Sequence, residues 1–128
     1  MTARRGERVE VGVEVCFVIG RGGAILWADA SDSAVALPDS RARWEAIWRH
    51  RGELDAIAHS HPVGPAAFSA EDESTMQAVD SALGRAMRYC VVAPRATIAR
   101  VGERNERVSP EPWWAGLLRL ASGMRKED

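Results

Sequence analysis

The length, composition and charge of the chain indicate a globular protein of ordinary composition. It has 128 residues, enough for one hydrophobic core and too few for two, so we expect a single domain over residues 1–128. Hydrophobic residues make up 46% and charged residues 27%, and a net charge of -1 without a strong basic cluster argues against a nucleic-acid partner. No apolar run approaches the roughly 20 residues of a membrane span, and the charged N-terminus lacks the apolar segment of a signal peptide. We therefore expect a cytoplasmic protein that binds neither membranes nor nucleic acid.

The first half of the chain predicts strands and one helix. The expected strands and helix are residues 9–19, 24–28, 34–37 (a short strand) and 41–50 (the helix). The first strand alternates and then becomes continuously apolar, as in a strand covered on both faces, with Glu14 at the edge of its buried part. It forms a hairpin with the second strand. Helical spacing places Trp44, Ile47 and Trp48 on the core-facing side of the helix.

The second half alternates strands and helices in the same way. The expected elements are a strand at 54–58, a helix from Ser69 to about 83, a strand at 87–93, an edge strand at 96–101, a charged turn at 102–107 and a helix from Ser109. This order predicts an α/β or α+β domain, with a mixed sheet flanked by helices and the strand before His59 at its centre. Cys16 and Cys90 lie in apolar runs and are expected to be buried free thiols.

The stretch after the strand at 54–58 is rich in metal-binding side chains. His59 and His61 are one residue apart, so on a strand both imidazoles point the same way while Ser60 points away. A loop rich in proline and glycine then leads to Ser69 and Asp72 at a helix start. Neutral imidazole and carboxylate suit zinc, and a catalytic zinc site has three protein ligands. The sequence therefore predicts that His59, His61 and Asp72 bind zinc, with purely structural histidines as the alternative.

The spacing of these residues resembles the signature of the JAMM/MPN+ zinc metalloproteases. Seven residues separate His61 from Ser69, two more separate Ser69 from Asp72, and Pro62 follows the second histidine as in that family. By pattern, the resemblance covers residues 9–101. It implies a single MPN (JAB) domain of the compact prokaryotic type, with a fold similar to cytidine deaminases.

The resemblance also implies a role for each site residue. The three ligands named above would hold Zn²⁺, and Ser69 would hydrogen-bond the developing oxyanion. The family uses a glutamate on an early strand as general acid/base. Glu14, in the segment Glu-Val-Cys-Phe-Val-Ile-Gly, is most similar to it, although Phe17 replaces the family's small residue. Glu10, on the same strand face, is the alternative.

The activity implied is hydrolysis of a peptide or isopeptide bond by a zinc-activated water. The expected substrate is a ubiquitin-like or sulfur-carrier protein, cleaved after its C-terminal tail. A non-catalytic MPN scaffold is a second interpretation. A third is a RadC-like protein, whose loop usually begins His-Asn-His-Pro-Ser-Gly where this chain has His-Ser-His-Pro-Val-Gly.

Overall fold

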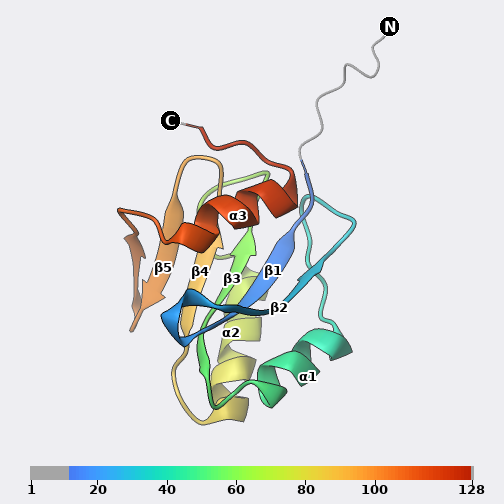
Figure 1. Cartoon of the computed structure of the whole chain (residues 1–128), viewed down its shortest axis with the longest axis vertical. Helices are drawn as coiled ribbons and strands as arrows, with labels where there is room; N and C mark the ends of the chain where they lie inside the picture. Colours follow the sequence, from blue (N-terminus) through green and yellow to red (C-terminus); the bar gives the residue numbers. More distant parts are fainter. Residues whose placement is uncertain (1–11, 128) are drawn as a thin grey trace, which may run out of the picture.

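A mixed sheet forms the centre of the molecule, which a computed structural model describes for residues 12–127. Over these residues the sheet has six strands in the order β2-β1-β3-β4-β5-β6, accompanied by three α-helices (Figure 1). The elements are β1 (Val15–Gly20), η1 (Arg21–Gly23), β2 (Ile25–Ala30), α1 (Arg41–Arg49), β3 (Leu54–Ser60), α2 (Ala70–Leu83), β4 (Arg88–Val92), β5 (Thr97–Val101), β6 (Arg104–Arg107) and α3 (Trp113–Ser122). The predicted α+β class is confirmed.

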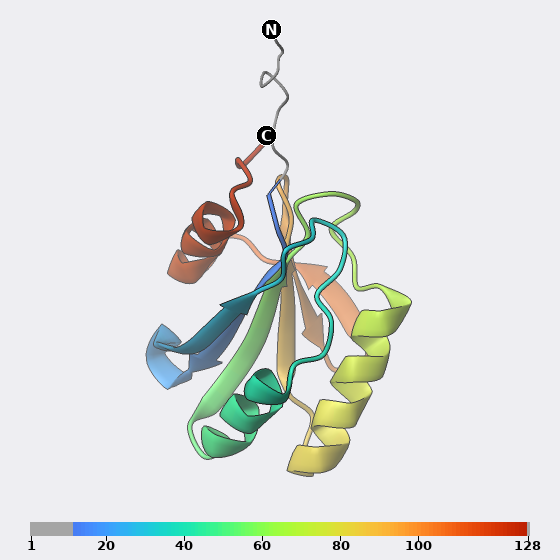
Figure 2. The same ribbon diagram turned by 90° about the vertical axis from the view of Figure 1, so that its right-hand side faces the viewer.

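Helices cover both faces of the sheet. Helix α3 lies on one face, and α1 and α2 lie on the other (Figure 2). Successive side chains of a strand point to opposite faces, so β1 contributes to two cores. Val15, Phe17 and Ile19 pack in the core beneath α3, whereas Cys16 and Val18 pack in the core with α1 and α2. This double burial explains the continuous apolar run in the sequence of β1.

Strand β3 lies in the interior of the sheet, as predicted. It pairs antiparallel with β1 and parallel with β4, so that His59 lies opposite Cys16 on one side and Val91 on the other. Just beyond the strand, the backbone N–H of His61 donates to the Val92 carbonyl at 2.8 Å. The backbone that carries both histidines is therefore held by neighbouring strands.

The chain before β1 and after β2 differs from the prediction. Strand β1 begins at Val15, and the part of the expected first strand before residue 12 lies outside the described residues. The predicted strand at 34–37 is wrong, because this segment is irregular. The Ser31 hydroxyl donates to the Ser33 carbonyl at 2.8 Å, and the Ser33 hydroxyl accepts from the Val35 N–H at 3.1 Å. Such local bonds compete with a strand ladder.

The far edge of the sheet also differs from the prediction. Residues 102–107 were expected as a turn, but Arg104–Arg107 forms β6 and pairs with β5. Strand β5 is thus an inner strand and β6 is the edge. All of β6 is exposed, and its charged side chains suit an edge strand because they discourage pairing with other chains.

The predicted core-facing side of helix α1 is confirmed for Ile47 and for Trp44, which packs partly buried against the same core, and is wrong for Trp48. Ile47 is buried, but Trp48 is 53% exposed and lies under the Arg51 guanidinium, 3.9 Å from the ring centroid. Arg43 is buried, because its guanidinium donates to the Asp29 carboxylate at 2.9 Å and 3.2 Å. An arginine whose charge is paired in this way can be buried although no apolar pattern predicts it.

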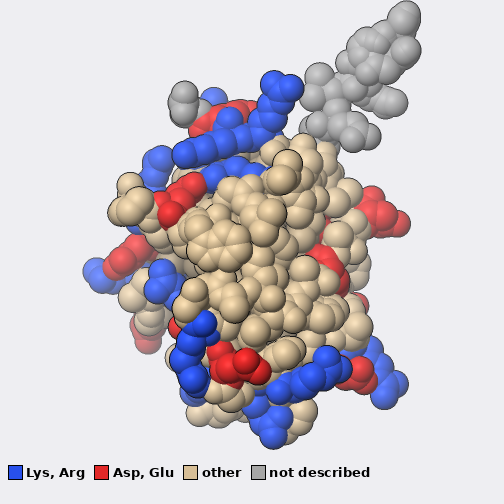
Figure 3. Space-filling model, viewed as in Figure 1, with Lys and Arg blue, Asp and Glu red and all other residues tan. Residues whose placement is uncertain are grey.

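The remaining structural predictions concern the cysteines and the last helix. Cys16 and Cys90 are buried free thiols, as expected. Helix α3 begins at Trp113 rather than Ser109, after the Pro112 N-cap position. The face of the molecule that α3 covers is largely uncharged at its centre, with charged side chains around it (Figure 3). Within the described residues, none of the helices combines the length and apolar character needed to cross a membrane.

Candidate metal centre

The end of β3 and the start of α2 bring three metal-binding side chains together. Their potential ligand atoms lie within 4.8 Å of one another: Nε2 of His59, Nε2 of His61 and Oδ2 of Asp72. The two imidazole nitrogens are 3.0 Å apart. The carboxylate oxygen lies 3.2 Å from His59 Nε2 and 3.3 Å from His61 Nε2. The predicted ligands thus converge closely enough to bind one metal ion.

The orientation of His61 is fixed by a backbone carbonyl. His61 Nδ1 lies 3.3 Å from the carbonyl oxygen of Pro65. A carbonyl oxygen only accepts hydrogen bonds, so Nδ1 carries a proton and Nε2 faces the other two ligands. Nε2 can donate to Asp72 when the ring is charged and can offer a lone pair to a metal ion when the ring is neutral. A histidine held in this way by its second nitrogen is typical of metal sites. The histidine spacing alone did not predict this role of Pro65.

The N-terminus of α2 fixes the orientation of Asp72. The Ser69 N–H donates to Asp72 Oδ2 at 2.8 Å, and the Asp72 N–H donates to Ser69 Oγ at 3.0 Å. This reciprocal pair is a capping box, which satisfies backbone donors at a helix start. Oδ2 is also the oxygen that faces both histidines. The predicted N-cap at Ser69 is confirmed, and it directs the carboxylate toward the imidazoles.

The charges of the cluster favour a cation. Burial alone would raise the pKa of Asp72, but hydrogen bonds from His59 and His61 hold that pKa far below its ordinary value, so the carboxylate is ionised. Burial alone would lower the pKa of His61, but its hydrogen bonds with Asp72 and the Pro65 carbonyl raise it. The site therefore attracts positive charge, and a metal ion competes there with a proton.

Glu14 lies in the same cleft as two of the candidate ligands. The cleft has a volume of about 260 Å³, and its lining includes Glu14, His61, Ser69 and Asp72. The glutamate is only 6% exposed. Its burial raises the pKa of the carboxyl to about 7; the nearby positive charge of His61 opposes this rise and the negative charge of Asp72 adds to it. A carboxyl with a pKa near neutrality can accept and release a proton during a reaction.

Ser60 joins the strand of the histidines to the chain around Glu14. Its buried hydroxyl accepts from the Val15 N–H at 2.9 Å and lies 3.4 Å from the Val13 carbonyl, to which it donates. The two residues on either side of Glu14 are thus bound to β3. The sequence predicted only that Ser60 points away from the metal; its link to the segment of Glu14 depends on strand pairing that the motif does not contain. The alternative base, Glu10, lies outside the described residues.

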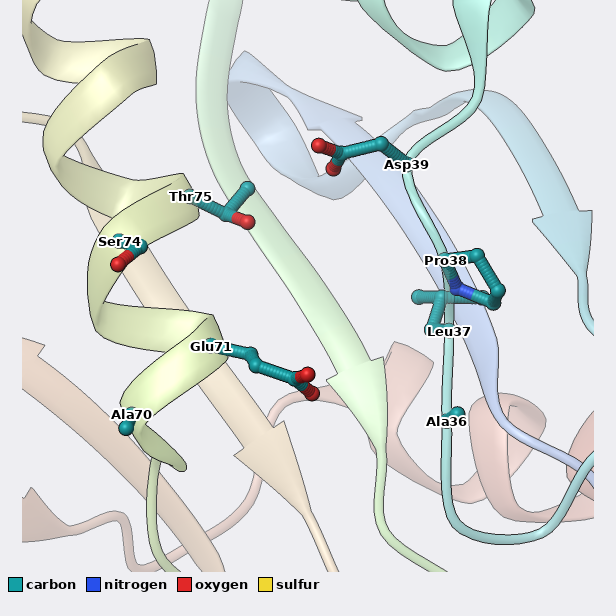
Figure 4. A pocket seen from close by; sticks show the side chains of 8 residues that line it. All are labelled: Ala36, Leu37, Pro38, Asp39, Ala70, Glu71, Ser74 and Thr75. Carbon is teal, nitrogen blue, oxygen red and sulfur yellow. The ribbon is translucent and has the colours of Figure 1, made fainter.

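A groove continues from the cleft along α2. It has a volume of about 480 Å³ and runs between residues 36–39 and the first turns of the helix. The groove and the cleft share four lining residues: Ala36, Leu37, Glu71 and Thr75. Figure 4 shows Glu71 and Asp39 extending into the groove from opposite sides. The candidate metal ligands therefore lie beside an open groove between two segments of the chain.

Comparison with known proteins was consistent with this arrangement. Residues 6–114 match the family model described as prokaryotic homologs of the JAB domain. The matched range contains Glu14 and the strand β1 that follows it, both histidines and the start of α2. None of the curated proteins matches the chain.

Proposed function

Because the chain belongs to the family of prokaryotic JAB-domain homologs, we propose that it is a zinc-dependent peptidase or isopeptidase. The observation that carries this proposal is the convergence of His59, His61 and Asp72 within 4.8 Å of one another. The carboxyl of Glu14 in the adjoining cleft supports catalysis in addition to metal binding. Burying a carboxyl group costs free energy of folding. A role of Glu14 in proton transfer would explain why a carboxyl is buried there.

The donor atoms of the three residues fit zinc. Two imidazole nitrogens and one carboxylate oxygen are ligands that zinc commonly takes, and three protein ligands leave a position for water or substrate. His59, His61 and Asp72 would hold the ion. When bound, zinc supplies a Lewis acid that polarises a carbonyl and brings the pKa of a water close to neutral.

Glu14 and Ser69 carry the remaining roles in the proposed reaction. Glu14 accepts the proton of the attacking water as the water oxygen bonds to the carbonyl carbon, and it returns a proton to the amine as the C–N bond breaks. The Ser69 oxygen already accepts from the Asp72 N–H at 3.0 Å. A hydroxyl has one hydrogen to donate, and Ser69 donates it to the oxygen on which negative charge develops.

We assign an extended C-terminal tail of a ubiquitin-like or sulfur-carrier protein as the substrate. The groove of about 480 Å³ beside the cleft supports this class, because it continues from the candidate metal centre along α2. An extended chain in this groove would place one peptide or isopeptide bond near the candidate ligands, while the folded carrier stays outside.

The test is cleavage of carrier-tail fusions by the purified, zinc-loaded protein. Wild type should cleave the fusion after the tail and lose this activity on chelation. Glu14→Gln should retain zinc and lose cleavage by about 10²–10⁴-fold, because the proton acceptor is gone. Glu106→Gln, an exposed glutamate of β6, is the matched control and should retain the wild-type rate. Cleavage by Glu14→Gln at the wild-type rate would exclude Glu14 as the base. Zinc binding without cleavage of any ubiquitin-like or sulfur-carrier fusion would contradict the proposal and favour a scaffold.

A further inference from the structure

Arg100, on β5, makes an unusually complete set of contacts for a surface arginine. Its Nη1 donates to Glu73 Oε1 at 3.0 Å, and its Nη2 donates to the other oxygen of the same carboxylate. Its Nε donates to Asn105 Oδ1 at 2.7 Å. The guanidinium also lies over the ring of Phe68, 5.2 Å from the centroid. Each of the three guanidinium nitrogens thus donates one hydrogen bond, and one face of the group lies over an aromatic ring.

The partners of Arg100 on the α2 side lie at both ends of the segment that carries Asp72. Phe68 directly precedes Ser69, the N-cap of α2, and Glu73 directly follows Asp72. Phe68 also lines the cleft, and its ring centroid is 6.2 Å from that of His59. Arg100 therefore holds the capping box from both ends and attaches it to the sheet.

We propose that Arg100 is a positioning residue for the metal centre, which holds the first turn of α2 and the Phe68 side of the cleft in place against β5. This inference rests on the proposed function, because it assigns Arg100 a role toward the metal ligand Asp72. A bidentate arginine–carboxylate pair fixes geometry as well as charge, and lysine does not reproduce it. The first turn of a helix has few internal hydrogen bonds and opens readily. Contacts from Arg100 on β5 should therefore stabilise the first turn of α2.

A helix-dipole role for Glu73 is a simpler explanation, since a carboxylate in the first turn is favourable by itself. It does not account for the placement of the guanidinium over Phe68 or for the bond to Asn105. Under that explanation, removal of Arg100 leaves the first turn unchanged. The two explanations therefore predict different behaviour of the Asp72 and Glu73 amides.

The first experiment measures amide hydrogen exchange by NMR on the full-length, metal-free protein. The reporters are the N–H groups of Asp72 and Glu73, which bond to Ser69 Oγ and to the Ser69 carbonyl, each at 3.0 Å. Arg100→Ala should speed their exchange by about tenfold relative to amides of β3, and Arg100→Lys should restore part of the protection. The control is Arg104→Ala, which removes an arginine paired with Glu106 at 2.8 Å on the exposed edge strand. Exchange in Arg100→Ala equal to that in the control would overturn the inference.

The second experiment measures metal binding by the same variants. Arg100→Ala should bind zinc about three- to tenfold more weakly than wild type, toward the low end of effects seen for residues around metal ligands. Its visible Co²⁺ spectrum should also change, because the ligand geometry loosens. The Arg100→Ala/Glu73→Ala double variant should bind no more weakly than Arg100→Ala if the two residues act as a pair.

The outcomes of the two experiments separate the inference from the proposed function. Wild-type affinity and an unchanged Co²⁺ spectrum in Arg100→Ala would overturn the role at the metal centre, even with faster exchange. Failure of the wild type to take up any zinc or cobalt would contradict the proposed function. In that case the exchange experiment alone would still decide whether Arg100 holds the first turn of α2.

Discussion

Ser60 and Val15 are joined by a hydrogen bond of 2.9 Å between the serine hydroxyl and the valine N–H. Regular pairing of β1 with β3 begins at Cys16 opposite His59, so this bond lies just beyond the ladder. The serine is completely buried. Ser60 lies between the two histidines, and its bond to Val15 holds the residue after Glu14. The bond therefore fixes the position of the candidate base relative to the candidate ligands.

We expect Ser60→Ala to reduce both stability and activity. The buried Val15 N–H loses its side-chain acceptor, which should cost about 1–3 kcal/mol in the free energy of unfolding. Cleavage should fall because Glu14 is held less well, while zinc content stays at the wild-type level. Urea unfolding, zinc analysis and turnover of a carrier-tail fusion measure these effects. Ser81→Ala, an exposed serine of α2, is the control. Wild-type stability and turnover in Ser60→Ala would show that the bond is dispensable.

Substitutions of Ser69 separate its capping role from its proposed catalytic role. Aspartate is as good an N-cap as serine, so Ser69→Asp should keep the unfolding free energy within about 0.5 kcal/mol of wild type. It lacks the hydroxyl donor, so cleavage should fall by about 10²–10³-fold. Ser69→Thr keeps both groups and should retain activity. Thermal unfolding and kcat are the measurements. A fully active Ser69→Asp variant would contradict the oxyanion role.

The pair of Glu111 and Arg119 predicts a pH dependence of stability. Both oxygens of Glu111 accept from the buried Arg119 guanidinium at 2.7 Å, and Thr97 Oγ1 donates to one of them at 2.7 Å. The hydrogen bonds from Arg119 are the main reason that the pKa of Glu111 is lowered to about 2, despite partial burial. A carboxyl with a lowered folded-state pKa stabilises the protein above its ordinary pKa. That stability is lost as the pH falls toward about 2.

Glu111→Gln should therefore destabilise the protein by about 2–4 kcal/mol at neutral pH, because it leaves Arg119 buried without its counter-charge. The difference in unfolding free energy between the variant and the wild type should shrink as the pH falls from roughly 4.5 to 2. Denaturant unfolding over this pH range measures it, with Glu106→Gln as the exposed control. A difference from wild type that is constant with pH would contradict the assigned pKa.

The candidate metal centre was the part of the molecule best predicted from sequence. The motif gives the identity and spacing of His59, His61 and Asp72, and a strand followed by a capped helix brings such residues together. Patterns between residues close in sequence are sufficient to predict this site. The alternation of side chains along a strand orients the two histidines, and the capping box orients Asp72.

Features that depend on distant partners were not predictable in the same way. Arg43 is buried because Asp29, on the neighbouring strand β2, neutralises its charge. Strand β6 forms because β5 offers it a partner, although its own residues are charged. The hydroxyl of Ser60 finds its partners at Val15, the first residue of the neighbouring strand β1, and at Val13 just before that strand. For Arg43 and Ser60 the deciding interaction joins residues that no local pattern relates, whereas β6 is the second strand of a hairpin with β5.

The most direct test of the zinc centre is metal content by mass spectrometry, with wild type and His61→Ala purified side by side without a tag. His61 supplies one of the three converging ligand atoms, and its loss leaves two. We predict about one zinc per wild-type chain and almost none in the variant, with both proteins folded by circular dichroism. A folded wild type that contains no zinc and takes up none when it is added would contradict the proposed metal centre.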